Sequence, residues 1–128
     1  MTDRFFDADA TPTVVRIARP LIDAFTRSPR CPPAHRWHAR STLPLLALFV
    51  TMCHEPGPDG PDWARLDPEA LLAASLEADP AELGFLQDLL DVSAAFYAFL
   101  ADEGLVDSAR AATLRRRLGR LAVGLRAA

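Results

Sequence analysis

The sequence predicts an all-α protein, a compact bundle of about five helices around one long central helix at about residues 80–103. The strongest observation is that both ends of this helix are marked. Asp79 is a good N-cap, Pro80 suits the first helical position, and Glu82 completes a capping box. Gly104 follows the last periodic residue, where a left-handed C-terminal cap is expected. The second observation is that apolar residues recur at helical spacing between proline-marked breaks along the whole chain.

The first predicted helix opens at Thr11-Pro12 and ends near Ser28-Pro29. Five apolar residues fall on one face at helical spacing: Val14, Ile17, Ala18, Leu21 and Phe25. Pro20 lies among them and lacks an N–H, and its ring crowds the carbonyl of Arg16. We therefore expect a kink there, or two short helices. Residues 1–10 are predicted to be an extended arm, and residues 11–128 a single helical domain.

The second predicted helix follows a proline-rich, extended stretch. Ser41 or Thr42 is expected to cap it, with Pro44 in its first turn. A helix that is apolar on all sides is predicted to be buried. The apolar residues of this helix are Leu43, Leu45, Leu46, Leu48, Phe49, Val50 and Met52.

The third predicted helix is short and starts at Asp67-Pro68-Glu69. The long helix after it has apolar residues over roughly 200° of its surface, so at least two other elements should pack on it. Alanines occupy the remaining arc in its second half: Ala94, Ala95, Ala98 and Ala101. These alanines reflect either the high helix propensity of alanine or a flat strip of small side chains that lets another helix approach closely.

The last predicted helix is capped by Asp107 or Ser108 and runs to about Leu125. Its apolar residues alternate three and four apart and form a narrow seam: Ala111, Leu114, Leu118, Leu121 and Leu125. Six arginines surround this seam. We read it as a peripheral helix held along one line of contact.

Length and composition limit the classes of protein to which the chain can belong. The chain has 128 residues, half of them hydrophobic, which suits one domain with a real core. We see no signal peptide, and the longest apolar run, residues 43–53, is about half the length that a membrane span needs. Two cysteines do not indicate a disulfide scaffold. We expect a cytoplasmic protein with no membrane partner.

The charged residues are sorted along the chain. All fourteen basic residues are arginine, which reflects either GC-rich coding or selection for bidentate contacts to carboxylates and phosphates. Residues 1–40 carry a net charge of +3, residues 41–107 carry −12, and residues 108–128 carry +6. The C-terminal helix is therefore basic beside an acidic body. We expect Asp88, Asp91 and Asp102 to be its intrachain partners.

The chemistry-bearing residues do not form a recognisable catalytic or cofactor motif. Cys31, His35, His38 and Cys53 would make a Cys₂His₂ zinc set, but their spacing matches no known pattern, and we predict no metal and no cofactor. Ser93 and Tyr97 lie one turn apart in the apolar arc. We expect them to form a satisfied core pair, the alternative being a polar point inside an apolar pocket.

The arginines Arg115, Arg116, Arg117 and Arg120 form the densest basic cluster and are the candidates for phosphate contacts. We expect a solvated or internally neutralised helix face there. The preceding AAFYAFLADEGLVD segment, together with the basic helix, resembles part of the helical core-binding domain of tyrosine recombinases. This likeness covers about a quarter of the chain and consists of a buried helix, a glycine cap and a second helix. We assign no family on it.

The sequence therefore predicts a non-catalytic interaction module, a small subunit or adaptor of a larger assembly. Its partner would be another protein or a second copy of the chain. The predicted partner-binding residues are Phe5 and Phe6 in the arm and Ala94, Ala98 and Ala101 on the long helix. The alternative is a small nucleic-acid-associated subunit that uses the C-terminal arginine helix.

Overall fold

The computed structural model describes residues 13–53, 60–78 and 83–127. Within these ranges the chain forms five α-helices and two short 3-10 turns, without any β-strand, so the predicted all-α class is confirmed. The helices are α1 (Thr13–Thr26), α2 (Arg36–Cys53), α3 (Pro68–Ala78), α4 (Leu83–Asp102) and α5 (Ser108–Ala127), and the turns are η2 (Pro33–His35) and η3 (Trp63–Arg65).

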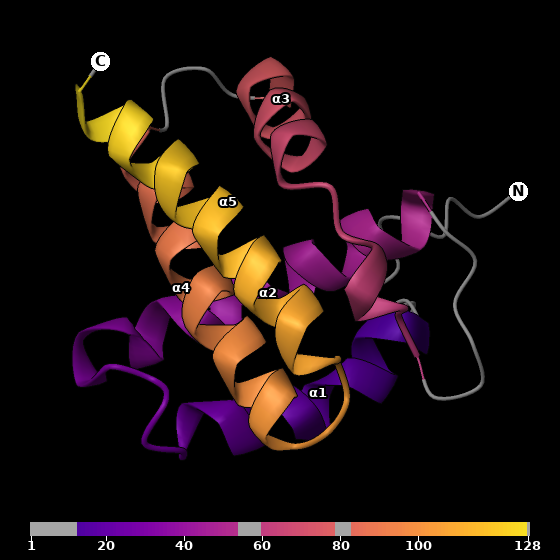
Figure 1. Cartoon of the computed structure of the whole chain (residues 1–128). Coiled ribbons are helices and arrows are strands. Elements are labelled where there is room, and N and C mark those ends of the chain that lie inside the picture. Colours follow the sequence, from indigo (N-terminus) through magenta and orange to yellow (C-terminus); the bar gives the residue numbers. More distant parts are fainter. Residues whose placement is uncertain (1–12, 54–59, 79–82, 128) are drawn as a thin grey trace, which may run out of the picture.

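Helix α4 is the centre of the bundle, as predicted. It forms an antiparallel hairpin with α5, and α2 crosses its other side (Figure 1). Helix α1 packs chiefly on α2, and α3 packs chiefly on α5. By length and composition α4 could cross a membrane, but more than half of it is buried under the other helices. This burial is typical of the core helix of a bundle.

The turn between α4 and α5 has the predicted cap. Gly104 adopts a φ of +73°. The N–H of Leu105 donates to the carbonyl of Leu100 at 2.9 Å, and the N–H of Gly104 donates to that of Ala101 at 3.1 Å. These two bonds define a Schellman motif. Asp107 then caps α5, because its carboxylate accepts the backbone N–H groups of the second and third residues of the helix. The predicted start signals of α4 at Asp79, Pro80 and Glu82 lie outside the described residues.

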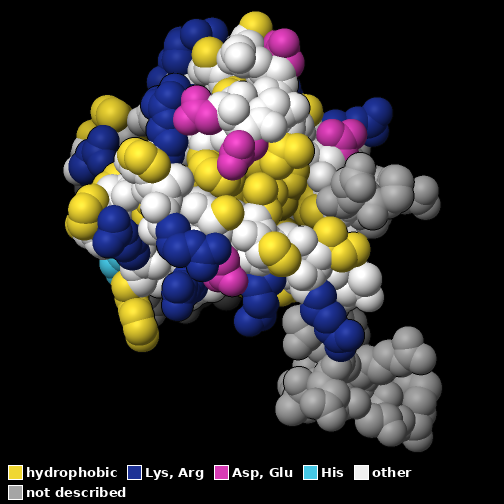
Figure 2. Space-filling view, turned by 90° about the horizontal axis from the view of Figure 1, so that it is seen from below, with side chains coloured by type: hydrophobic (Ala, Val, Ile, Leu, Met, Phe, Trp, Pro, Cys, Tyr) yellow, Lys and Arg dark blue, Asp and Glu magenta, His cyan; other side chains and the backbone are white. Residues whose placement is uncertain are grey.

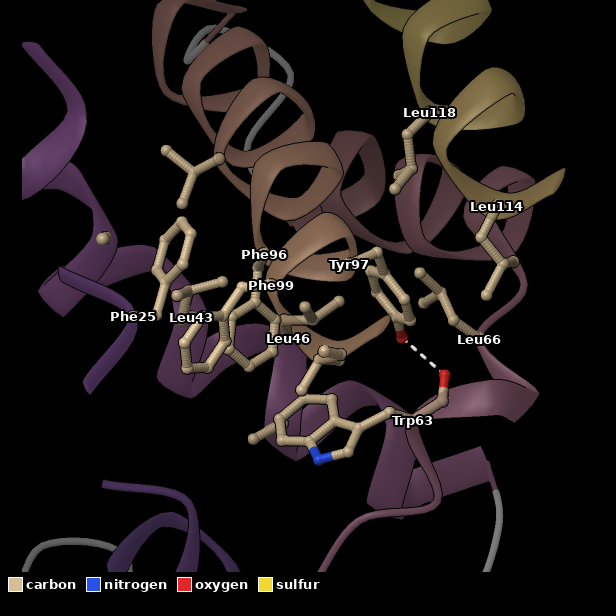
Figure 3. Packing of buried hydrophobic residues seen from close by; sticks show 14 of the residues in the cluster. Phe25, Leu43, Leu46, Trp63, Leu66, Phe96, Tyr97, Phe99, Leu114 and Leu118 are labelled. Carbon is tan, nitrogen blue, oxygen red and sulfur yellow. Dashed lines mark hydrogen bonds between the residues drawn. The ribbon is translucent and has the colours of Figure 1, made fainter. Parts of the chain in front are cut away.

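An aromatic cluster joins α1 and η3 to α4. The ring of Phe96 meets that of Phe25 edge to face at 5.3 Å between centroids, and that of Trp63 at 5.1 Å (Figure 3). Pairs of this geometry contribute about 0.5–1.5 kcal/mol each beyond the area that they bury. On the opposite side of α4, Leu114 and Leu118 of the α5 seam are fully buried. The predicted seam is thus the line along which α5 docks.

The first two helices differ from their predicted boundaries. Helix α1 continues through Pro20 as one helix, so the alternative of two short helices is wrong. Both Pro20 and Arg16 lie on the exposed side, where water can bind the carbonyl that loses its helical partner. Helix α2 begins at Arg36, before the predicted cap at Ser41 or Thr42, because Pro33 starts a helical turn that leads into it.

The predicted burial of α2 on all sides is also wrong. Leu43, Leu46 and Val50 are buried, but Met52 is 84% exposed and Leu45 is 44% exposed. The reason is the position of α3. It rests on α5 and stands away from the rest of the bundle (Figure 1), so it does not cover this side of α2.

Candidate functional site

An open groove lies between the second half of α2, helix α3 and the first half of α4. Its volume is about 470 Å³. Among the described residues, all of its lining side chains are apolar except that of Ser75; they are Leu45, Leu48, Phe49 and Met52 of α2, Leu71, Ala74 and Ser75 of α3, and Phe85, Leu86 and Leu89 of α4. We call this feature the apolar groove. Its size and lining are typical of a site that binds an apolar ligand or a partner's side chains.

The apolar groove arises from how α3 is attached. The start of α3 is held to α5, because the guanidinium of Arg117 contacts the carboxylates of Asp67 and Glu69. Leu71 is buried near this end, whereas Leu72 and Leu76 further along the helix are only partly buried. The helix is therefore anchored at one end, and its apolar side chains face an incompletely filled space.

The arginines of α5 divide into two groups. Arg110 donates to the carbonyl oxygens of Ala64 at 2.8 Å and of Leu66 at 3.4 Å, so it binds η3 and the residue after it. The hydrogen bond from Arg117 lowers the pKa of the Glu69 carboxyl and raises that of the guanidinium itself. These two arginines act as structural ties within the chain.

The remaining predicted phosphate contacts, Arg115, Arg116 and Arg120, have no acidic partner within salt-bridge distance among the described residues. All three are exposed. Seen from below in Figure 2, the molecule shows arginine side chains on several sides of an apolar area, with acidic side chains among them.

The expected partners of the C-terminal helix are correct in one case of three. Asp91 lies 3.7 Å from the guanidinium of Arg126 in α5. Asp102 instead receives two hydrogen bonds from Arg30, at 2.6 and 3.0 Å, which lower the pKa of its carboxyl. Asp88 lies 3.5 Å from His38.

The candidate zinc ligands are not brought together. Cys31 is buried before the start of α2, and Cys53 is exposed at its far end. An 18-residue helix is about 27 Å long, far beyond the reach of one tetrahedral site. The rings of His35 and His38 lie 6.3 Å apart near the Cys31 end. Among the described residues no three His, Cys, Asp or Glu side chains are grouped as metal ligands would be.

Ser93 and Tyr97 are both buried, but they do not form the expected pair. The hydroxyl of Tyr97 donates to the backbone carbonyl of Trp63 at 2.5 Å (Figure 3). The hydroxyl of Ser93 is buried and has no hydrogen-bond partner among the described residues. The tyrosine therefore ties η3 to α4, and the serine takes no part in this link.

The predicted partner-binding alanines of α4 are partly or fully buried within the chain. Ala98 is buried, and Ala94 and Ala101 are partly buried against the core. They follow Asp91 at three- and four-residue spacing, and Asp91 contacts α5 through Arg126. Their role toward an outside partner stays a prediction. Phe5 and Phe6 lie outside the described residues.

The sequence did not predict the apolar groove, although the apolar residues of α2 that line it were recognised. Leu45, Leu48, Phe49 and Met52 form an apolar run that has the same pattern whether the helix is covered or open. Comparison with known proteins adds no homologous site: the chain matches no protein-family model, no curated protein and no solved structure.

Proposed function

We propose that the chain is a non-catalytic interaction module whose docking surface is the apolar groove. The observation that carries this proposal is the groove's lining, in which the described residues contribute nine apolar side chains and one serine around an open volume of about 470 Å³. Open apolar surface of this kind is unfavourable in water, and in soluble proteins it commonly marks an interaction site.

An amphipathic helix is the partner that fits this surface best. A groove between helices accepts apolar side chains that recur at i, i+3 or i+4, and i+7 on one face of a helix. Methionine adapts to differently shaped side chains, and Met52 stands at the edge of the groove, 84% exposed. The segment that holds the groove is strongly acidic, with −12 over residues 41–107, so basic residues flanking the partner's apolar face would be favoured.

Site-specific photo-cross-linking tests the proposal. A photoreactive amino acid replaces Met52 in one variant and Val123 of α5 in a matched control. Both positions are exposed, and Val123 does not line the groove. We expect position 52 to cross-link one defined peptide with helical apolar spacing, and Leu45→Glu to abolish that product without unfolding the protein.

The identity of the cross-linked peptide separates the two kinds of partner. A peptide from another protein supports the adaptor role, and a peptide from this chain supports a homo-oligomer. Equal and non-specific labelling from positions 52 and 123 would refute the groove as a docking surface.

A further inference from the structure

A second hollow surface, unrelated to the apolar groove, runs along the junction of α1 and α2. Two adjoining depressions of about 460 and 290 Å³ share Arg27 and Arg40. The first also has Thr26, Arg36 and Trp37 in its wall, and the second has Val15, Arg19, Ile22, Asp23 and Pro44. We call the combined surface the arginine cleft.

The arginine cleft concentrates positive charge that the described carboxylates of the chain leave largely unpaired. Among the described residues, four arginines line it, Arg19, Arg27, Arg36 and Arg40, against one acid, Asp23. None of the four lies within salt-bridge distance of a carboxylate in the described parts of the chain. Elsewhere the fold does pair such groups, as it does for Arg30 and Arg117. Unpaired guanidinium groups around one hollow create a local potential that attracts anions.

An exposed aromatic ring stands in the same cleft. Trp37 is 82% exposed, although tryptophan is on average one of the more buried residues, and the chain's other tryptophan, Trp63, lies in the core. Trp37 lies beside Arg36 in the first turn of α2, and Arg40 follows it at helical spacing. The cleft thus combines a planar apolar face with forked donors suited to phosphate oxygens.

We propose that the arginine cleft binds single-stranded nucleic acid. The arginines contact the phosphates, and one base stacks on Trp37. Positively charged grooves with aromatic platforms are typical of proteins that bind single strands without sequence preference. A duplex would leave the platform unused, because its base faces are already stacked. The protein's net charge of −3 does not oppose this site, since the acids are concentrated in residues 41–107.

Fluorescence anisotropy of a labelled single-stranded oligonucleotide, titrated with the full chain over a range of salt concentrations, tests the site. We expect binding at low salt that weakens steeply as salt rises, with a log–log slope of about −0.7 for each phosphate contacted, or about −3 for four contacts. Arg27→Ala with Arg40→Ala should reduce the size of this slope by about 1.4. Trp37→Ala should lower the affinity about 5- to 150-fold with an unchanged slope, because stacking is not a charge interaction.

The matched control is Arg116→Ala with Arg120→Ala, which removes the same charge from the exposed face of α5. It should leave the binding almost unchanged apart from a small general loss of charge. All the substituted side chains are exposed, so circular dichroism should show intact helices in each variant.

Four results would overturn the proposal. One is absence of binding at low salt. The second is loss of binding with the α5 double variant and not with the cleft double variant. The third is duplex binding that is equally tight and insensitive to Trp37→Ala. The fourth is equally tight binding of polyglutamate, which would identify the cleft as a site for acidic peptides.

Discussion

Tyr97 should make the stability of this fold sensitive to alkaline pH. Burial raises the pKa of its hydroxyl far above the ordinary value of about 10. In the folded chain the phenol therefore stays protonated and donates to the carbonyl of Trp63. In the unfolded chain it loses its proton above about pH 10. The folded state then binds more protons than the unfolded state, so the free energy of unfolding falls as the pH rises above that value.

The composition of the chain makes this effect measurable. There is no lysine, and Tyr97 is the only tyrosine. Between about pH 10 and 12 it is therefore the main side chain whose protonation differs between the two states. One proton corresponds to a loss of about 1.4 kcal/mol per pH unit. Burial also raises the pKa of the Cys31 thiol, which adds a loss that begins near pH 9.

The assay is urea unfolding from pH 7 to pH 11.5. All proteins compared carry Cys31→Ala, so that of the two groups with a raised pKa only Tyr97 remains. Tyr97→Phe should cost about 1–3 kcal/mol at pH 7, because it removes a buried hydrogen bond. Above pH 10 the free energy of unfolding of the Tyr97→Phe variant should fall less steeply than that of the Cys31→Ala parent. Parallel curves for the two proteins would refute the assignment of the alkaline loss to Tyr97.

Ser93→Ala is the matched control, one turn from Tyr97 in the same core. Its hydroxyl is buried and has no partner in the part of the chain that the structure describes, so removing it should leave stability unchanged or slightly raised. A cost above about 1 kcal/mol, the usual worth of one hydrogen bond, would show that Ser93 makes a bond that the geometry does not reveal.

Three further predictions concern the helices. Leu90→Ala should cost about 2–5 kcal/mol in urea unfolding, because it opens a cavity in the core. Leu118→Asp should cost about 3–5 kcal/mol and speed hydrogen exchange along α5, whereas the exposed Arg116→Ala should change stability by less than about 0.5 kcal/mol. Gly104→Ala should cost about 1–2 kcal/mol through its positive φ, whereas Gly119→Ala, inside α5 and with open space around it, should raise the melting temperature.

The sequence predicts those elements that depend on local chemistry. The glycine cap at Gly104, the Asp107 cap of α5 and the Asp67-Pro68 start of α3 are each decided by neighbours within a few residues. The seam through Leu114 and Leu118 is likewise set by helical spacing. Such features need no knowledge of distant contacts, and all of them agree with the structure.

The features that sequence reasoning missed depend on tertiary position. Whether Met52 is covered is decided by where α3 rests, which no periodicity within α2 encodes. The same holds for the arginine cleft. Arg19 and Arg27 belong to one helix, Arg36 and Arg40 to the next, and only the packing of α1 on α2 brings them around one hollow. In the sequence, arginines are densest in the C-terminal helix, so the phosphate contacts were predicted there.

All basic residues of the chain are arginine, either through GC-rich coding or through selection for bidentate contacts. The contacts in the structure distinguish these two explanations for individual arginines. Arg30 makes two parallel hydrogen bonds to Asp102, and Arg110 reaches two backbone carbonyls at once. A lysine ammonium, as a single point charge, cannot reproduce this forked geometry. At Arg115 and Arg120, which face solvent, lysine would serve equally well. Coding bias therefore suffices for the outer face of α5, whereas the ties between helices require the guanidinium. The four arginines of the cleft have the same forked donors, but none lies within salt-bridge distance of a described carboxylate, and the anionic ligand that we propose would supply the missing acceptors.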